Sequence, residues 1–251
     1  MRRLGKARQT MGAPFQVKKR LSIAALTLAA GWSATAVAAD PPPDAMAILK
    51  AVRVAQTSEH IALLGGLRTG PTTVPFRLVI DGQNIRYEFT NPTQAIALHL
   101  GEKTSKLEEV NRSGTEKIPP ARYDAKVRGS DISYEDLAMH FLYWPEATLD
   151  GEETKILRKC WKLEVKPGSV ESQYSRVTLW VEEESGALLQ AEAYDKAGKL
   201  ARRFSVKSVQ KADGVWILKQ MRIEQTPGAG GDRTPTYLEI SGVEKEKEKA
   251  K

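Results

Sequence analysis

The sequence predicts an α+β domain in which an antiparallel β-sheet takes up most of the chain. First, apolar and polar residues alternate in short runs over residues 76–110 and 157–243, which is the period of half-buried strands. Second, short turns such as Asp213-Gly214 join these runs at even spacing, as in an antiparallel meander. Third, helical periodicity is confined to residues 45–57 and 133–144.

The first 38 residues have the composition of a secretory signal peptide. They carry seven Arg or Lys residues and no acid, an apolar run at 21–30, and a small-x-small cleavage site at Ala36-Val37-Ala38. The apolar run is too short to span a bilayer, which disfavours the alternative of an uncleaved anchor. No cysteine follows the cleavage site, so we do not expect a lipid anchor there.

The positive charge of the chain belongs to this leader. The whole sequence has 38 basic and 31 acidic residues, and removal of the leader's seven basic residues leaves 31 of each. The remaining chain is formally neutral, which argues against a nucleic-acid partner. Cys160 excludes an internal disulfide because it has no second cysteine to pair with, and its place in a strand favours a buried spectator over a reactive thiol.

Each predicted element has its own local signal. Asp44 is a plausible N-cap for the helix at 45–57, which places Ile48, Leu49 and Val52 on one face with Lys50 and Arg53 opposite. Residues 61–70 are ambiguous between strand and turn. The expected strands are 76–80, 85–90, 95–100, 106–110, 157–165, 174–182, 188–194, 200–209, 215–225 and 236–243.

The second helix, at residues 133–144, has the strongest signals. Ser133 and Asp136 have the spacing of a capping box, and Pro145 ends a helix of about three turns. His140 falls on the side expected to be solvated. The apolar stripe of this helix consists of Tyr134, Leu137, Ala138, Phe141 and Leu142.

The segment GSD-x-SYEDL at residues 129–137 resembles a GSDFSYEDL-like segment of the outer-membrane lipoprotein-sorting proteins, relatives of the periplasmic lipoprotein carrier LolA. The resemblance is clearest over residues 129–243. It implies a strongly curved, incomplete antiparallel β-barrel with an N-terminal helix and a short helical lid. The implied organisation is a signal peptide at 1–38, a LolA-like lipid- or lipoprotein-binding domain at 39–243, and a charged tail at 244–251.

If the second helix is a lid over an acyl-chain cavity, as the resemblance implies, specific residues would contact the lipid. The lipid-facing lid residues would be Tyr134, Leu137, Phe141 and Leu142, and possible wall residues are Trp161, Trp180, Trp216 and Met221. Two alternatives stay open from the residues alone. The helix could be ordinary core that covers a sheet, and a closed sandwich would equally explain strands with apolar groups on both sides.

Catalytic patterns are not evident in the sequence. The three histidines are scattered, and no nucleophile elbow or phosphate-binding loop is present, so we expect no catalytic residues, metal or cofactor. A novel hydrolase stays open as a minor alternative.

The resemblance therefore predicts a soluble, monomeric periplasmic carrier. Its ligands would be lipoprotein acyl chains or free lipid, and its protein partner would be an inner-membrane transporter or an outer-membrane acceptor. The alternative is a non-carrier accessory or interaction subunit of an envelope transporter or assembly complex.

Overall fold

The computed structural model describes residues 43–57, 60–101, 105–212, 215–226 and 234–244. The predicted signal peptide and residues 245–251 of the predicted tail lie outside these ranges. The chain divides into two compact units, Met1–Pro41 and Pro42–Lys251, and every described residue belongs to the second.

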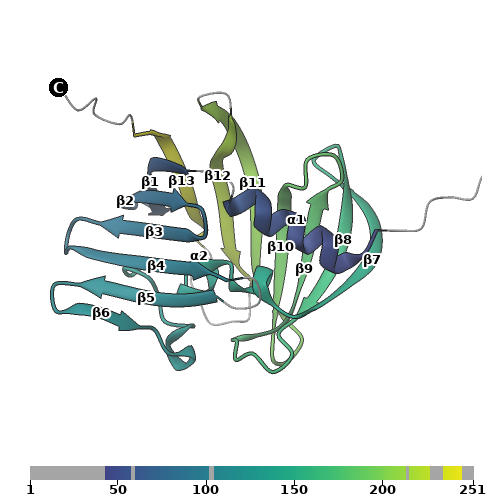
Figure 1. Ribbon diagram of the computed structural model, residues 1–251, viewed down its shortest axis with the longest axis horizontal. Coiled ribbons are helices and arrows are strands. Elements are labelled where there is room, and N and C mark those ends of the chain that lie inside the picture. Colours follow the sequence, from purple (N-terminus) through teal and green to yellow (C-terminus); the bar gives the residue numbers. More distant parts are fainter. Residues whose placement is uncertain (1–42, 58–59, 102–104, 213–214, 227–233, 245–251) are drawn as a thin grey trace, which may run out of the picture. The chain divides into compact units, whose positions relative to one another are not determined.

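The described strands form one open antiparallel sheet (Figure 1). Its order is β6-β5-β4-β3-β2-β1-β13-β12-β11-β10-β9-β8-β7, so all neighbours are consecutive in the chain except β1 and β13, which join the two halves. The predicted meander is therefore confirmed. The bounds are β1 His60–Thr69, β2 Thr72–Asp81, β3 Asn84–Phe89, β4 Gln94–Leu100, β5 Ser105–Asn111, β6 Gly114–Lys117, β7 Glu146–Lys155, β8 Arg158–Lys166, β9 Tyr174–Glu182, β10 Leu188–Asp195, β11 Leu200–Ala212, β12 Val215–Gln225 and β13 Thr236–Val243.

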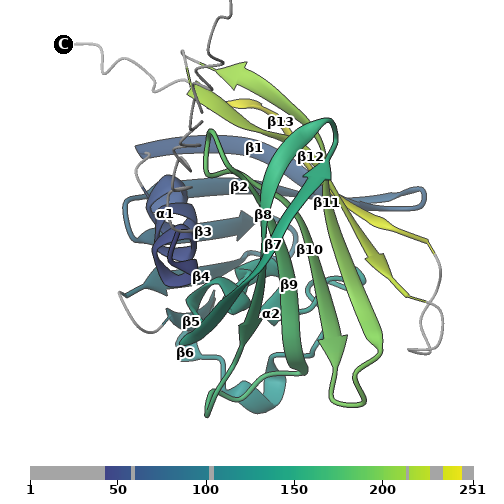
Figure 2. The same cartoon turned by 90° about the vertical axis from the view of Figure 1, so that its right-hand side faces the viewer.

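The sheet curves strongly, and the helices lie on its concave side (Figure 2). These are α1 (Ala45–Thr57), α2 (Tyr134–Ala138) and the 3₁₀ helix η2 (His140–Tyr143); a further 3₁₀ turn, η1, spans Pro120–Arg122. Residues from α1, η2 and both halves of the sheet share one hydrophobic core. The helices thus fill the hollow of the sheet.

Helix α1 forms where its sequence predicts. The Ala47 amide donates a hydrogen bond to the Asp44 carboxylate at 3.0 Å, as an N-cap should. The face with Ile48, Leu49 and Val52 is buried in the core. Burial of this apolar stripe, more than helix propensity, holds a helix of this length in place.

Three features of the sheet differ from the sequence prediction. The prediction lacks β6, whose residues are all exposed, and β7, whose polar pattern gives no strand signal. Gly151 lies inside β7, at a bulge where the pairing with β8 shifts. Leu157, predicted to alternate with strand residues, sits in the β7–β8 turn with 96% of its surface exposed.

Candidate functional site

The segment that the sequence singled out, residues 133–144, is two short helices and not one of three turns. Helix α2 ends at Ala138 because Met139 adopts a left-handed conformation (φ 44°), and η2 follows directly. The predicted capping box is present: the Ser133 amide donates to Asp136 Oδ2 at 3.0 Å, and the Asp136 amide donates to Ser133 Oγ at 3.1 Å.

The acidic side of α2 is buried as deeply as its apolar side. Asp136 Oδ1 accepts a hydrogen bond of 2.5 Å from the Tyr174 hydroxyl of β9, and Oδ2 lies 3.3 Å from Nε of Arg202 in β11. Glu135 accepts hydrogen bonds from the Ser172 hydroxyl and, at 3.0 Å, from the Gln173 amide. Glu135 and Asp136 of the motif therefore attach α2 to the sheet through hydrogen bonds and an ion pair.

Burial shifts the protonation of this network. It raises the pKa of Glu135 to about 7, against the opposing hydrogen bonds from Ser172 and Gln173. Burial and the neighbouring Asp136 carboxylate raise the pKa of Tyr174 well above its ordinary value. Tyr174 therefore stays a neutral hydrogen-bond donor to Asp136.

His140 corrects a further expectation, because it is buried and not solvated. Only 7% of its surface is exposed, and its ring packs edge-on against Tyr123 with centroids 5.2 Å apart. Burial lowers the pKa of the imidazole, so the ring stays neutral near neutral pH.

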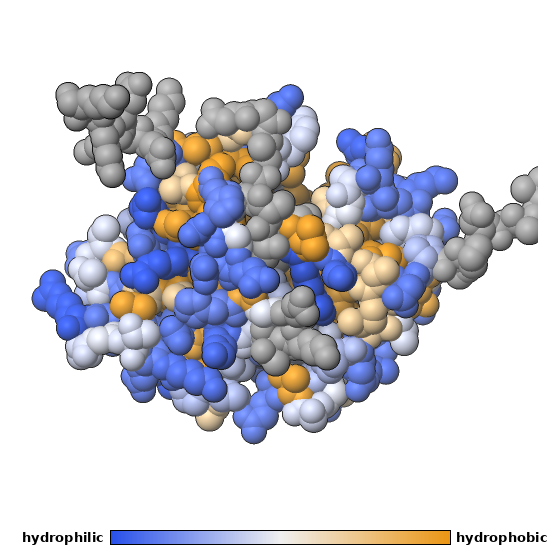
Figure 3. Space-filling view, in the orientation of Figure 1, coloured by the Kyte–Doolittle hydropathy of each residue, from blue (hydrophilic) through white to orange (hydrophobic). Residues whose placement is uncertain are grey.

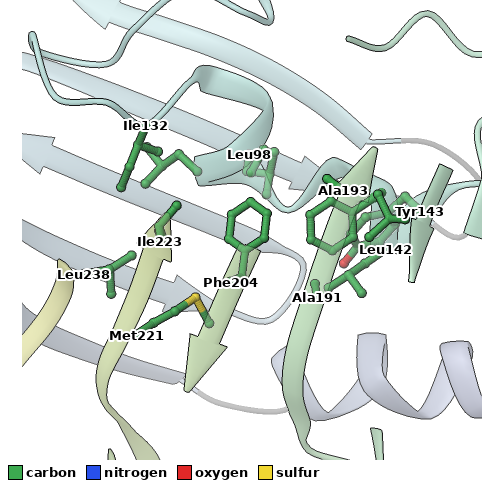
Figure 4. Packing of buried hydrophobic residues seen from close by; sticks show 14 of the residues in the cluster. Leu98, Ile132, Leu142, Tyr143, Ala191, Ala193, Phe204, Met221, Ile223 and Leu238 are labelled. Carbon is green, nitrogen blue, oxygen red and sulfur yellow. The ribbon is translucent and has the colours of Figure 1, made fainter. Parts of the chain in front are cut away.

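The predicted lid residues lie together in the core. Tyr134, Leu137, Phe141 and Leu142 each expose 5% of their surface or less. The ring of Phe141 packs on that of Phe204 at 5.6 Å between centroids, and Figure 4 shows Leu142 near Ala191 and Ala193 of β10. The space beneath this segment is occupied by side chains of the sheet itself.

The four predicted wall residues are not brought together. Met221 is part of the core, and Trp161 packs partly against it. Trp180 is buried outside the core cluster, with its indole N–H donating to Glu153 at 2.9 Å and Lys155 4.3 Å above its ring. Trp216 is 68% exposed on the β11–β12 hairpin.

A groove of about 540 Å³ lies elsewhere, between α1, the end of β4 and the end of η2. This volume is in the range of small-molecule and lipid sites. Its lining combines apolar and cationic side chains: Met46, Lys50, Arg53, Val54, Leu100, Tyr143, Trp144 and Pro145, with Gln83 and Gly101 at the rim of the sheet.

Arg53 connects α1 to η2 at the wall of this groove. Its guanidinium donates to the carbonyl oxygens of Leu142 and Trp144, at 2.5 and 3.2 Å, and lies 5.2 Å from the ring centroid of Tyr143. Burial lowers the pKa of Arg53, while Tyr143 opposes this shift. The forked geometry of arginine suits two carbonyl oxygens at once.

Two buried donors beside Arg53 lack partners. Among the described residues, none forms a hydrogen bond with the Tyr143 hydroxyl or the Trp144 indole N–H, although Tyr143 and Trp144 expose only 6% and 1% of their surfaces. Burial raises the pKa of Tyr143 to about 12, so its hydroxyl keeps its proton. Buried groups without a partner are uncommon and carry an energetic cost.

The groove residues of α1 form a regular pattern in the sequence. Met46, Lys50, Arg53 and Val54 follow the spacing i, i+4, i+7, i+8, which is a second stripe on the helix beside the core stripe. Because two of the four are cationic, the stripe is indistinguishable in sequence from an ordinary solvated face.

Neither a metal cluster nor a membrane-spanning helix is found in the described ranges. No group of three or more His, Cys, Asp or Glu side chains there could hold a metal ion. No helix in the same part of the chain has the length and apolarity to cross a bilayer.

Comparison with known proteins places the chain in a family. A family model described as "Uncharacterized protein" matches residues 111–248, more than half of the chain. The chain belongs to this family. No curated protein matches the chain.

Solved structures show that the fold is LolA-like. A DUF1329 family protein from Desulfovibrio piger superposes with a TM-score of 0.62 at 22% identity. A putative outer membrane lipoprotein-sorting protein domain from Vibrio parahaemolyticus gives 0.64 at 17%, and a LolA superfamily protein from Nitrosomonas europaea gives 0.61 at 17%. Each comparison covers 80% of this chain and 93% of the other. The resemblance read from GSD-x-SYEDL thus extends to the architecture.

Proposed function

We propose that this protein is a periplasmic carrier that binds an acyl chain of a lipoprotein or free lipid in the groove along α1. The observation that carries the proposal is the groove itself, in which apolar side chains lie next to the cations Lys50 and Arg53. An amphiphile with an acyl chain and an oxygen-rich head matches both parts of this lining.

The driving force is burial of hydrocarbon. Each methylene group removed from water contributes about 0.8 kcal/mol. The head of the ligand, an ester carbonyl or a carboxylate, would lie near the positive charges of Lys50 and Arg53.

Entry of a longer chain requires α1 to move. The groove holds part of a lipid, and the space under α2 is filled by core side chains. Helix α1 is the element that borders the groove over its whole length, and the contacts of Arg53 with η2 are the polar link that would have to open. Release of this link would extend the groove toward the core.

Binding can be tested with a fluorescent fatty acid as the probe. Met46→Trp should fill the groove and weaken binding of the probe at least about tenfold, while Val170→Trp, an exposed position in the β8–β9 loop, should leave binding unchanged. Native mass spectrometry of periplasmic protein provides the second readout. Protein that is always empty and takes up no probe would overturn the carrier proposal.

A second candidate function is an accessory subunit of an envelope transporter or assembly complex, without lipid cargo. The dense packing of Tyr134, Phe141 and Leu142 over the sheet favours it, because a closed interior has no need for a mobile lid. Co-purification of a membrane partner by a protein that binds no probe would support this candidate over the carrier. In either case we propose that the chain is not an enzyme.

A further inference from the structure

The β11–β12 hairpin exposes an apolar strip that the groove does not use. Val209 and Leu218 face each other across the hairpin, as do Lys211 and Trp216. Val209 and Trp216 expose 52% and 68% of their surfaces. In Figure 3 apolar surface lies around the upper part of these two strands. An exposed tryptophan beside valine and leucine is unusual for a surface that meets only water.

Unpaired cations surround this strip. Lys207, Lys211 and Lys219 are all exposed, and no acidic side chain within the described ranges forms an ion pair with any of them. By contrast, the nearest acid of the neighbouring strand, Glu239, is bound to Arg68 at 2.7 Å. The strip therefore combines an aromatic ring, aliphatic side chains and a local positive charge.

A second apolar point lies at the same edge of the sheet. Because the strands alternate in direction, the β7–β8 and β11–β12 turns fall on one edge, and both rise at the upper edge of Figure 1. Ile156 and Leu157 occupy the β7–β8 turn with 66% and 96% exposure. Both have positive φ, 51° and 62°, a conformation that a β-branched residue rarely adopts. The β9–β10 turn, which carries Glu182, Glu183 and Glu184, lies between these two turns, so the positive charge is confined to the β11–β12 hairpin.

We propose that the β11–β12 hairpin, through Trp216 and the lysines around it, docks on the surface of an anionic phospholipid bilayer. Tryptophan prefers the boundary between lipid headgroups and hydrocarbon, and lysines near a membrane are drawn to anionic headgroups. The positive charge favours a lipid surface over an apolar pocket of a protein. Docking through this hairpin would hold the proposed carrier at a membrane, so the inference adds a membrane-attachment site to the proposed function.

Flotation with vesicles tests the proposal directly. Wild-type protein should float with vesicles of phosphatidylethanolamine and phosphatidylglycerol but not with phosphatidylcholine alone, and added salt should reduce the bound fraction. Trp216→Ser, and Lys211→Glu combined with Lys219→Glu, should each weaken binding at least about tenfold at low salt. Val170→Ser and Lys199→Glu, exposed at the opposite edge, are the matched controls and should bind as wild type.

The outcomes separate docking from cargo binding. The Trp216 and lysine variants should keep the wild-type affinity for the fluorescent fatty acid and the wild-type unfolding midpoint in urea, since these side chains are exposed. Absence of wild-type binding to any vesicle would overturn the proposal and leave a protein partner for this edge. Equal loss in the control variants would overturn it as well, because binding would then depend on overall charge.

Discussion

Two regions on the concave side of the sheet, α1 and the α2–η2 segment, are attached in different ways. The α2–η2 segment is buried on every side, and its carboxylates Glu135 and Asp136 have partners in the chain segments that lead into and form β9. Helix α1 buries one stripe, while a second stripe borders the groove. The motif that carries the family resemblance therefore attaches α2 to the sheet, and the N-terminal helix is the more adaptable element.

The largest expected loss of stability comes from removing the contacts of Asp136 with the sheet. Asp136→Ala removes the partner of the buried Arg202 and of the Tyr174 hydroxyl, and should lower the free energy of unfolding by about 3–5 kcal/mol. Urea denaturation measures this loss. Asp150→Ala removes an exposed ion pair with Lys162 and should cost about 0–1 kcal/mol. Similar losses in the two variants would show that α2 is not fastened in this way.

The next effect is a pH dependence that belongs to Glu135. Its pKa in the folded protein, about 7, lies above the ordinary value of 4.5, so the folded state holds a proton that the unfolded state releases. The contribution of Glu135 to the free energy of unfolding is fully present below pH 4.5. It is lost as the pH rises from 4.5 to 7, and the total loss is about 3 kcal/mol.

Glu135→Gln tests this sign, because glutamine imitates the protonated carboxyl group. The variant should unfold at a higher urea concentration than wild type at pH 8, and the difference should shrink toward pH 5. Glu152→Gln, at an exposed position of β7, is the control and should follow the wild-type profile. A difference that does not vary with pH would contradict the assignment.

A smaller effect is expected at Arg53, on the α1 side of the comparison. Arg53→Ala loses two charged hydrogen bonds to backbone carbonyls and should lower the free energy of unfolding by about 1–3 kcal/mol. Hydrogen exchange should increase in α1 but not in α2. Lys50→Ala, on the same stripe, should change stability by less than about 0.5 kcal/mol. Faster exchange in α2 would mean that the two regions open together.

Sequence patterns predicted most of the fold because its signals are local. Hairpins such as the one at 81–84, the capping box of Ser133 and Asp136, and the apolar stripe of α1 depend on neighbours within a few residues. Strand β7 was not predicted, because its two faces are largely solvated and carry few apolar residues. The alternation on which strand prediction relies is therefore absent.

The candidate site was less accessible to prediction. Pro145 and the apolar period suggested one long helix, but tertiary packing places Met139 in a left-handed conformation and buries His140. The tryptophans illustrate the same limit. Trp161, Trp180 and Trp216 have similar strand contexts in the sequence, yet one packs partly on the core, one is covered by charged side chains and one is exposed.

The sequence by itself determined the class of fold, the order of most strands, the start of both helices and the family resemblance, because periodicity and caps are encoded within single elements. Only the tertiary structure decided which face of each strand is concave, that the acidic pair of α2 is a buried fastening, and that the groove runs along α1. These depend on the pairing of β1 with β13 and on the curvature of the sheet, which bring together side chains that are far apart in the chain and that no local pattern connects.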